Sequence, residues 1–322
     1  MTSQPIVECV PNYSEGNDVE KVFAIIRAMQ VENVRLLDYS LDRDHNRSVV
    51  TIAGSPDAVI EAAVRGAGKA AEVINLALQN GVHPRIGAAD VIPFVPVSSV
   101  SLAQCAVFAR QAGLQIWRRY GVPIYFYGAA ATRPDRVELE EIRRGQFEGL
   151  RESSVKDAAR RPDIGGPELH PSAGAIAVGA RNFLIAYNVY LGPSLGHGLE
   201  PASLSRNIGA ARAIAREIRD SSGGLRGVKA IGVIANGAAQ VSMNITDFRL
   251  TSVQSVFDRI RTLATRYGVA VAAGELIGLI PEEALRTGAT WTTEIPNFDP
   301  DLKVLERRLV RPMAWPPGYL QA

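Results

Sequence analysis

The sequence predicts an α+β protein made of two ferredoxin-like βαββαβ subdomains in tandem. Residues 6–97 carry strand and helix patterns in the order β-α-β-β-α-β, and residues 183–277 repeat that order. Between them, residues 153–172 are rich in Pro and Gly and lack hydrophobic periodicity, which is typical of a functional loop or a domain junction. We therefore expect one subdomain over residues 1–178, a second over 179–300, and a C-terminal extension over 301–322.

The first half begins with a short apolar strand and then alternates between helix and strand periods. Its clearest helix start is Ser55-Pro56-Asp57, which offers a capping residue, a proline at the first helical position and an acid in the first turn. That helix should reach Leu78, because its apolar residues form one stripe and Asn80-Gly81 follows. The expected strands are 6–10, 34–39, 48–53, 91–97 and 124–127, and the expected helices are 17–29, 55–78 and 101–120, with a short charged helix from Pro134.

The second half repeats the pattern of the first without repeating its residues. Asn236-Gly237 between two apolar runs is a specific signal for a tight β-hairpin. The expected strands are 183–191, 229–235, 240–245 and 269–277, and the expected helices are 203–219 and 253–267.

Composition argues against several classes of protein. Lys and Arg (35) nearly balance Asp and Glu (33), which favours neither a nucleic-acid-binding protein nor a polybasic membrane anchor. The most apolar long window, 173–192, contains Arg181 and two asparagines, so we expect no membrane span. Two cysteines, Cys9 and Cys105, cannot form a disulfide framework and are expected to be buried apolar residues. Because residues 1–5 also lack a signal-peptide pattern, we expect a cytoplasmic protein.

No phosphate-binding loop, dinucleotide fingerprint or nucleophile elbow is present, and the scattered histidines and cysteines predict no metal site. His83 is the first catalytic candidate, because Gly81 and Gly87 bracket it and Pro84 stiffens its loop. An imidazole held in this way can act as a general acid or base, and the neighbouring Arg85 would suit a carboxylate. The alternative is that His83 caps the end of the preceding helix.

Four other residues could line a site, and each also has a structural interpretation. His45 is either a solvated hairpin residue or a wall of the site, and His170 belongs either to a ligand-binding loop or to a linker. Asn12 could present its amide to a ligand or serve as a turn residue. Tyr127 could bond a ligand at the end of a strand, or be a half-buried aromatic residue with an exposed hydroxyl.

Several ordered motifs resemble the glutamate formimidoyltransferase family. They lie between residues 6 and 285 and begin with Val7-Glu8-Cys9-Val10-Pro11-Asn12-Tyr13-Ser14-Glu15-Gly16. The others are Asp42-x-Asp44-His45-Asn46-Arg47-Ser48-Val49, His83-Pro84-Arg85-Ile86-Gly87, Pro93-Phe94-Val95-Pro96-Val97, Tyr125-x-Tyr127-Gly128, Pro162-Asp163-x-Gly165, residues 179–188, Gln240-Val241-Ser242-Met243-Asn244 and Gly278-Leu279-Ile280-Pro281.

The resemblance implies transfer of a formimidoyl group from N-formimino-L-glutamate to N5 of the co-substrate tetrahydrofolate, in histidine breakdown. It also implies two ferredoxin-like subdomains with folate bound between them, in a homodimer. His83 is then the catalytic histidine, and Arg47, Arg85 and Arg181 are candidate anchors for substrate carboxylates beside Asn12 and Tyr127. The implied folate loop is Gly165, Gly166, Pro167, Glu168, Leu169, His170, Pro171, Ser172, Ala173 and Gly174.

The sequence departs from the family pattern at two positions near His83. Ser40 and Val82 stand where members commonly have acids, so we expect another group, Asp42 or Asp44, to orient the imidazole. Two alternatives stay open: a folate-binding homologue with weak or no transferase activity, and a transferase that uses another donor such as formiminoglycine. Because 322 residues leave no room for the cyclodeaminase domain that some members carry, a separate cyclodeaminase is the expected partner.

Overall fold

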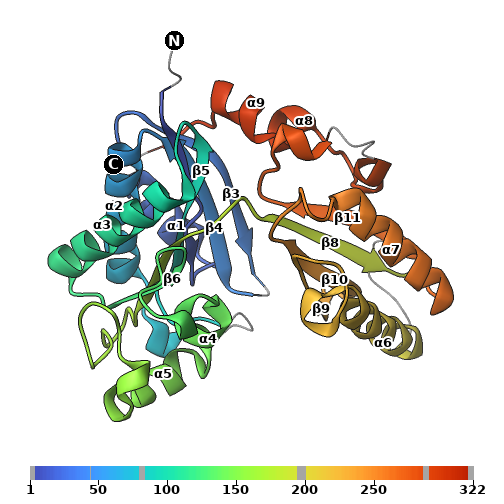
Figure 1. Cartoon of the computed structure of the whole chain (residues 1–322), viewed down its shortest axis with the longest axis horizontal. Helices are drawn as coiled ribbons and strands as arrows, with labels where there is room; N and C mark the ends of the chain where they lie inside the picture. The colour runs from blue at the N-terminus through green and yellow to red at the C-terminus, as the bar shows by residue number, and fades with distance from the viewer. Residues whose placement is uncertain (1–3, 44, 80–83, 194–200, 286–289, 318–322) are drawn as a thin grey trace. The chain divides into compact units, whose positions relative to one another are not determined.

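The structure, a computed structural model, describes residues 4–43, 45–79, 84–193, 201–285 and 290–317. The chain divides into two compact units, one formed by residues 1–182 with 312–322 and the other by residues 183–311. Each unit has its own sheet and its own hydrophobic core, which confirms the predicted α+β class (Figure 1). The boundary predicted at residue 178 lies inside a strand of the first unit.

The first unit is built on a seven-stranded sheet. Its strands are β1 (Ile6–Cys9), β2 (Asn12–Tyr13), β3 (Val34–Asp42), β4 (Arg47–Gly54), β5 (Ala89–Ser98), β6 (Ile124–Gly128) and β7 (Ile176–Ala180). Strands β1 and β2 are successive pieces that both pair with β4 and β5, and β3 pairs with the other edge of β4. Those pairings are antiparallel, whereas β7 runs parallel to β5 and β6.

Three long helices cover one face of this sheet: α1 (Val19–Ala28), α2 (Pro56–Val73) and α3 (Leu102–Tyr120). Alternate strand residues, such as Val50, Ile52 and Phe94, share a single core with the buried stripes of these helices. The order β1/β2-α1-β3-β4-α2-β5 is the predicted split βαβ unit. Two short helices, α4 (Leu139–Arg143) and α5 (Gln146–Lys156), follow β6.

Two predicted elements of the first unit differ from the structure. Helix α2 ends at Val73 rather than Leu78, because Ile74 is extended and the Asn75 side chain accepts a hydrogen bond from the backbone N–H of Ala77. Strand β7 was not predicted. It lies between two parallel neighbours and is apolar on both faces, so it lacks the alternation that marks a half-buried strand.

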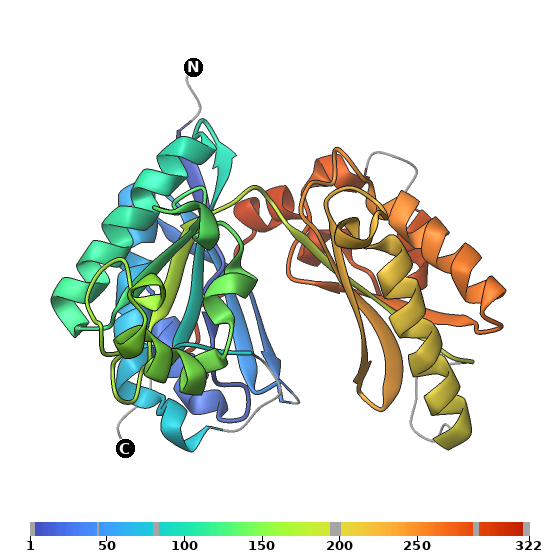
Figure 2. The same ribbon diagram turned by 60° about the horizontal axis from the view of Figure 1, so that its bottom comes forward.

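The second unit is a four-stranded antiparallel sheet with two helices on one side. Its elements are β8 (Ile185–Leu191), α6 (Pro201–Ile218), β9 (Val228–Ala235), β10 (Ala238–Ile245), α7 (Val253–Arg266) and β11 (Val271–Ile277). The strand order β11-β8-β10-β9 confirms the predicted second βαββαβ unit, and Figure 2 shows α6 and α7 side by side against the sheet. Asn236 and Gly237 both have positive φ, as the predicted tight hairpin requires.

The C-terminal residues are shared between the two units. Helices α8 (Pro300–Lys303) and α9 (Leu305–Val310) belong to the second unit, where Val304 lies in the core and Ile280 pairs with it. Residues from Pro312 belong to the first unit, where the Met313 N–H donates to the Leu36 carbonyl at 2.8 Å. The extension expected over residues 301–322 therefore divides at this point.

The capping box at the start of α3 gives a stability prediction. The Ser101 hydroxyl accepts from the Gln104 N–H, and the Gln104 side chain accepts from the Ser101 N–H. Ser101→Ala should lower the free energy of unfolding by about 1 kcal/mol in urea denaturation. Ser55→Ala is the matched control, because the Ser55 side chain makes no capping hydrogen bond. Equal losses in the two variants would contradict the capping role.

Candidate active site

The predicted catalytic residue His83 lies outside the described residues, but the segment that follows it is fixed by several hydrogen bonds. The Ile86 N–H donates to Asp90 Oδ1 at 2.7 Å, and the Ser14 hydroxyl donates to the Gly87 carbonyl at 2.7 Å. The Phe147 N–H donates to the Arg85 carbonyl at 2.8 Å. Residues 85–88 are therefore tied to α5, to β5 and to the turn that follows β2.

The same segment is joined directly to the predicted folate loop. The Ala88 N–H donates to the Ala173 carbonyl and the Ala175 N–H to the Ile86 carbonyl, both at 2.9 Å. A Cβ on Gly87 would lie 2.0 Å from the Ala175 carbonyl oxygen, so only glycine permits this approach. The structure thus places the residues that follow the predicted catalytic His83 against the end of the loop that the family resemblance implies for folate binding.

In the loop from Gly165 to Gly174, the C-terminal part is held by hydrogen bonds and burial, whereas residues 166–168 are exposed. His170 and Gly174 exchange two backbone hydrogen bonds of 2.9 Å, and Leu169 and Ala173 are buried. Residues Gly166 to Glu168, in contrast, are exposed. Gly165 and Gly166 have φ values of +79° and +84°, which favour glycine.

His170 works as an acceptor inside this loop, which predicts a pH dependence. Its Nδ1 accepts the Ala173 N–H at 3.0 Å and the Ser172 N–H at 3.4 Å, so this nitrogen must be unprotonated. Burial also lowers the pKa of His170 from its usual value of 6.5. The folded state therefore binds the proton less readily than the unfolded chain, and stability should be lost as the pH falls below about 6.5.

The measurement is the free energy of unfolding from pH 8 to pH 5 for the wild type and for His170→Asn. Asparagine offers an oxygen acceptor but no titrating ring, so the variant should lose less stability on acidification. Parallel pH profiles would show that His170 does not contribute.

Three of the predicted ligand-binding residues, Tyr127, Arg47 and Arg181, lie among charged side chains of the first unit, and Arg143 acts on the pKa of both Tyr127 and Arg47. Tyr127 is buried, which raises its pKa to about 12, although the charges of Arg181 and Arg143 partly offset this effect. Burial also lowers the pKa of Arg47, with Arg143 adding to that effect and Asp42 opposing it. Arg47 Nε is buried without a hydrogen-bond partner in the described part of the chain. These guanidinium groups provide positive charge suited to substrate carboxylates.

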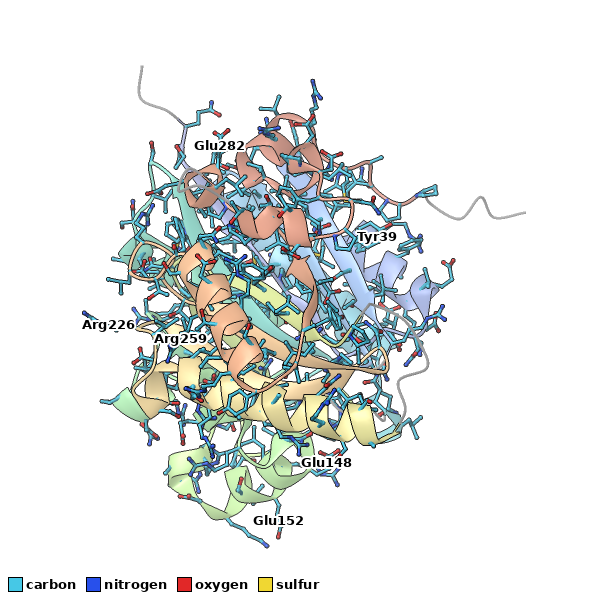
Figure 3. The ribbon with its side chains drawn as sticks, turned by 90° about the vertical axis from the view of Figure 1, so that its right-hand side faces the viewer. Tyr39, Glu148, Glu152, Arg226, Arg259 and Glu282 are labelled. Carbon is cyan, nitrogen blue, oxygen red and sulfur yellow. The ribbon has the colours of Figure 1, made fainter. Side chains whose placement is uncertain are left out.

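Arg85 and Asn12 donate side-chain hydrogen bonds within the protein, although Arg85 Nε, like Arg47 Nε, is buried without a partner among the described residues. Arg85 Nη2 donates to Glu148 Oε1 at 2.9 Å and to the Gln79 carbonyl at 3.0 Å (Glu148 is labelled in Figure 3). Asn12 Nδ2 donates to the Val10 carbonyl at 3.0 Å, as a turn residue would. Ligand binding by these two residues stays a prediction.

Asp42, one of two acids expected to orient His83, is engaged with another histidine. Its Oδ2 lies 2.7 Å from His45 Nδ1, and its Oδ1 accepts the His45 N–H at 2.9 Å. Ser40, which stands at one of the two departures from the family pattern, lies on β3 opposite Val49. Asp44 and Val82 fall outside the described residues.

Asp90 holds the segment that follows His83 in the chain, and the sequence did not single it out. Its carboxylate is 1% exposed and accepts from the Ile86 N–H, while Arg143 of α4 donates to its other oxygen. The only available signal was an acid at the start of an otherwise apolar strand pattern, in the run Ala89-Asp90-Val91. The partner Arg143 lies 53 positions away, so spacing could not reveal it.

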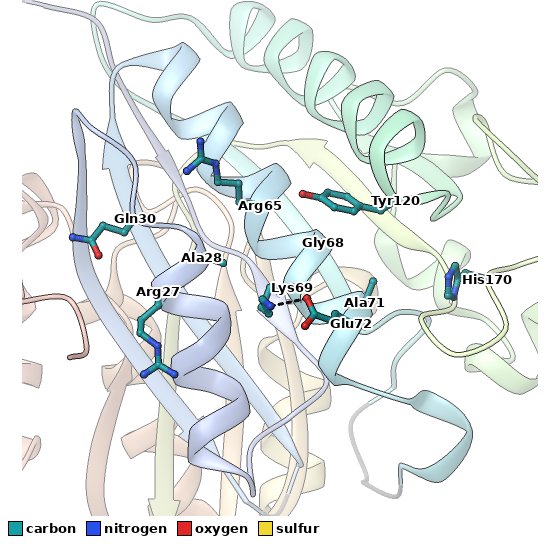
Figure 4. A pocket seen from close by; sticks show the side chains of 10 residues that line it. All are labelled: Arg27, Ala28, Gln30, Arg65, Gly68, Lys69, Ala71, Glu72, Tyr120 and His170. Atoms are coloured by element: carbon teal, nitrogen blue, oxygen red, sulfur yellow. Dashed lines mark hydrogen bonds and ion pairs between the residues drawn. The ribbon is translucent and has the colours of Figure 1, made fainter. Parts of the chain in front are cut away.

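A groove of about 580 Å³ lies on the helical side of the first unit, with α1 and α2 residues and Tyr120 in its walls (Figure 4). Of the predicted site residues, only His170 lines it. Its cationic groups already have partners: Lys69 pairs with Glu72 and Arg65 with Glu61. We therefore place the candidate site at the junction of residues 85–88 with the Gly165–Gly174 loop, and not in this groove.

Comparisons with known proteins match both units. The formiminotransferase domain, N-terminal subdomain, matches residues 6–181, and the formiminotransferase domain matches residues 186–304. A glutamate formimidoyltransferase of Streptococcus pyogenes serotype M1 is 40% identical over 308 residues, 95% of this chain and 99% of that protein. Another from Thermoplasma acidophilum is 40% identical over 94% of this chain and 97% of its own length. A mouse formimidoyltransferase-cyclodeaminase is 38% identical over 89% of this chain, but over only 52% of its own length.

Two further observations concern membrane spans and metals. In the described ranges, no helix is both long and apolar enough to cross a membrane. The same residues contain no group of three or more His, Cys, Asp or Glu side chains that could hold a metal ion.

Proposed function

Because the chain belongs to the formiminotransferase family, we propose that it transfers the formimidoyl group of N-formimino-L-glutamate to N5 of tetrahydrofolate. The products are 5-formimidoyltetrahydrofolate and glutamate. The observation that carries the proposal is the 40% identity to a glutamate formimidoyltransferase over 99% of that protein's length, which spans both units of this chain.

The reaction needs proton transfers rather than a covalent intermediate on the protein. N5 of tetrahydrofolate attacks the amidine carbon of the donor, which forms the N5–C bond and a tetrahedral intermediate. N5 must then lose a proton, and the glutamate nitrogen must gain one as its bond to the carbon breaks. His83 serves both steps, first as base and then as acid.

The described residues support this assignment through position and charge. Hydrogen bonds join residues 86–88, which follow His83 in the chain, to residues 173–175 at the end of the loop that we assign to folate. Both substrates carry carboxylates, for which Arg47 and Arg181 supply positive charge beside Tyr127. In this proposal tetrahydrofolate is a co-substrate, and the chemistry needs no metal.

We further propose that the enzyme works in histidine degradation, in the cytoplasm and as a homodimer. A separate cyclodeaminase would take up its product. The name of the mouse relative pairs the same two activities in one protein. The oligomeric state can be measured by light scattering during size-exclusion chromatography.

A steady-state assay with tetrahydrofolate and either formiminoglutamate or formiminoglycine tests the function. Turnover with formiminoglutamate as the better donor is the expected result. A higher kcat/KM with formiminoglycine would change the donor and leave the reaction class in place. Folate binding without turnover on either donor would contradict the proposal and favour a folate-binding homologue.

A further inference from the structure

The face of the second sheet opposite α6 and α7 carries a row of polar side chains. Strand register places Ser242, Asn188 and Glu275 side by side across β10, β8 and β11, with Tyr190 and Gln240 paired in the adjacent row. The alternate residues of these strands, such as Tyr187 and Val189, enter the core beneath the helices. Five polar residues from three strands are thereby grouped on one face.

Within this group, the hydrogen-bond donors to Glu275 all bind the same carboxylate oxygen, Oε2. Its Oε2 accepts from Tyr190 OH at 3.0 Å, from Asn188 Nδ2 at 3.1 Å and from Gln240 Nε2 at 3.4 Å. Tyr190 in turn accepts from Asn236 Nδ2 at 3.1 Å. No described residue donates to Oε1, so one oxygen is saturated and the other is available.

The three donors are themselves fixed. Tyr190, Gln240 and Asn188 are 5%, 4% and 9% exposed, so their side chains have little freedom to turn away. Burial, followed by the nearby charge of Glu275, raises the pKa of Tyr190 to about 12, and its hydroxyl stays a donor at neutral pH. The carboxylate is therefore oriented before any ligand arrives.

The charge of Glu275 has no cationic partner among the described residues. None of the described Lys, Arg or His side chains forms an ion pair with it, although Glu275 is only partly exposed. A purely structural carboxylate would gain more from a cation or from donors on both oxygens. An oriented carboxylate with one free oxygen is instead suited to a ligand that brings N–H donors or positive charge.

We propose that Glu275 Oε1, on a carboxylate whose other oxygen is held by the amides of Asn188 and Gln240, forms a subsite for a planar N–C–N donor group of one of the two substrates. This inference rests on the proposed function, because it takes its ligands from that reaction. Two groups have the required chemistry: the 2-amino-4-oxopyrimidine edge of the folate pterin, and the amidine of the formimidoyl donor. Each presents in-plane N–H groups to a single carboxylate oxygen, and the neighbouring amides can accept or donate beside it.

Glu275→Gln is the test variant, because it keeps the shape of the side chain and removes its charge. The KM for one substrate should rise about 10–100-fold, the range for a hydrogen bond to a charged group, while the KM for the other should change little. A rise for tetrahydrofolate identifies the pterin edge, and a rise for formiminoglutamate identifies the amidine. Glu217→Gln is the matched control, since Glu217 pairs with Arg266 on the helical side and both KM values should stay unchanged.

Calorimetric titration of wild type and Glu275→Gln with tetrahydrofolate, and separately with formiminoglutamate, keeps the subsite testable even if turnover is absent. A wild type that binds but does not turn over would refute the proposed transfer and leave the binding comparison decisive. If Glu275→Gln binds both substrates with the same Kd as the wild type, Glu275 does not form the proposed subsite, whether or not the enzyme turns over. Gln240→Ala is a second variant in case the first does not fold, and it should weaken binding of the same substrate by a smaller factor.

Discussion

Replacing His83 with alanine is expected to lower kcat by about 10²–10⁴-fold, the range for a lost general acid and base. The variant cannot remove the N5 proton or protonate the departing glutamate nitrogen, so both halves of the transfer slow. Tetrahydrofolate binding should be nearly unchanged, because the folate loop keeps its hydrogen bonds to residues 86–88. Single-turnover kinetics with saturating substrates measures the chemical step directly.

Two readouts separate a catalytic loss from a structural one. The unfolding midpoint and the tetrahydrofolate Kd of His83→Ala should match those of the wild type. If turnover persists at the wild-type rate, His83 is not the acid–base group, and the pH profile of kcat for the wild type would then point to a different titrating residue.

Replacing Asp163 with alanine is expected to cost about 3–5 kcal/mol of stability, the range for breaking a buried ion pair. Asp163 Oδ2 lies 2.6 Å from Arg136 Nη1, and the two side chains are only 8% and 5% exposed. Asp163 also accepts from the Phe126 N–H at 2.8 Å and from the Thr132 hydroxyl. The alanine variant leaves Arg136 buried with its charge uncompensated, and urea denaturation measures the loss.

The neighbouring Asp135 provides the comparison. It pairs with Arg133 at the surface, so Asp135→Ala should cause a much smaller change. A double variant, Arg136→Met with Asp163→Leu, should regain part of the stability because it removes both charges. If Asp163→Ala were no more damaging than Asp135→Ala, the buried pair would not be important for the fold.

Turns and helix starts that depend only on neighbouring residues could be predicted from the sequence. The Asn236-Gly237 hairpin and the start of α2 at Pro56 follow from short-range chemistry, and each is where the sequence placed it. The end of α2 was misplaced because the Asn75 side chain accepts a hydrogen bond from the Ala77 N–H, which competes with another helical turn. Strand β7 was missed because a strand buried on both faces has no period to detect.

For the candidate site, the sequence supplied the residues but not their partners. Sequence motifs indicated the segment around His83 and the Gly165–Gly174 loop, and in the structure residues 86–88 bond to residues 173–175. The sequence could not indicate that Arg85 pairs with Glu148, 63 positions away, or that the buried carboxylate of Asp90 accepts from the Ile86 N–H. Such pairings depend on which strands and helices become neighbours, which no local pattern specifies.

The backbone bonds between residues 86–88 and residues 173–175 imply that the two substrates should influence each other's affinity. If tetrahydrofolate stabilises one arrangement of the loop, it also stabilises the matching arrangement of the segment that carries His83. Thermodynamic linkage then requires the donor to strengthen folate binding by the same factor by which folate strengthens donor binding. With no side chain at Gly87 or Gly174 to act as a flexible spacer, the two segments would respond to ligands as a single cooperative element.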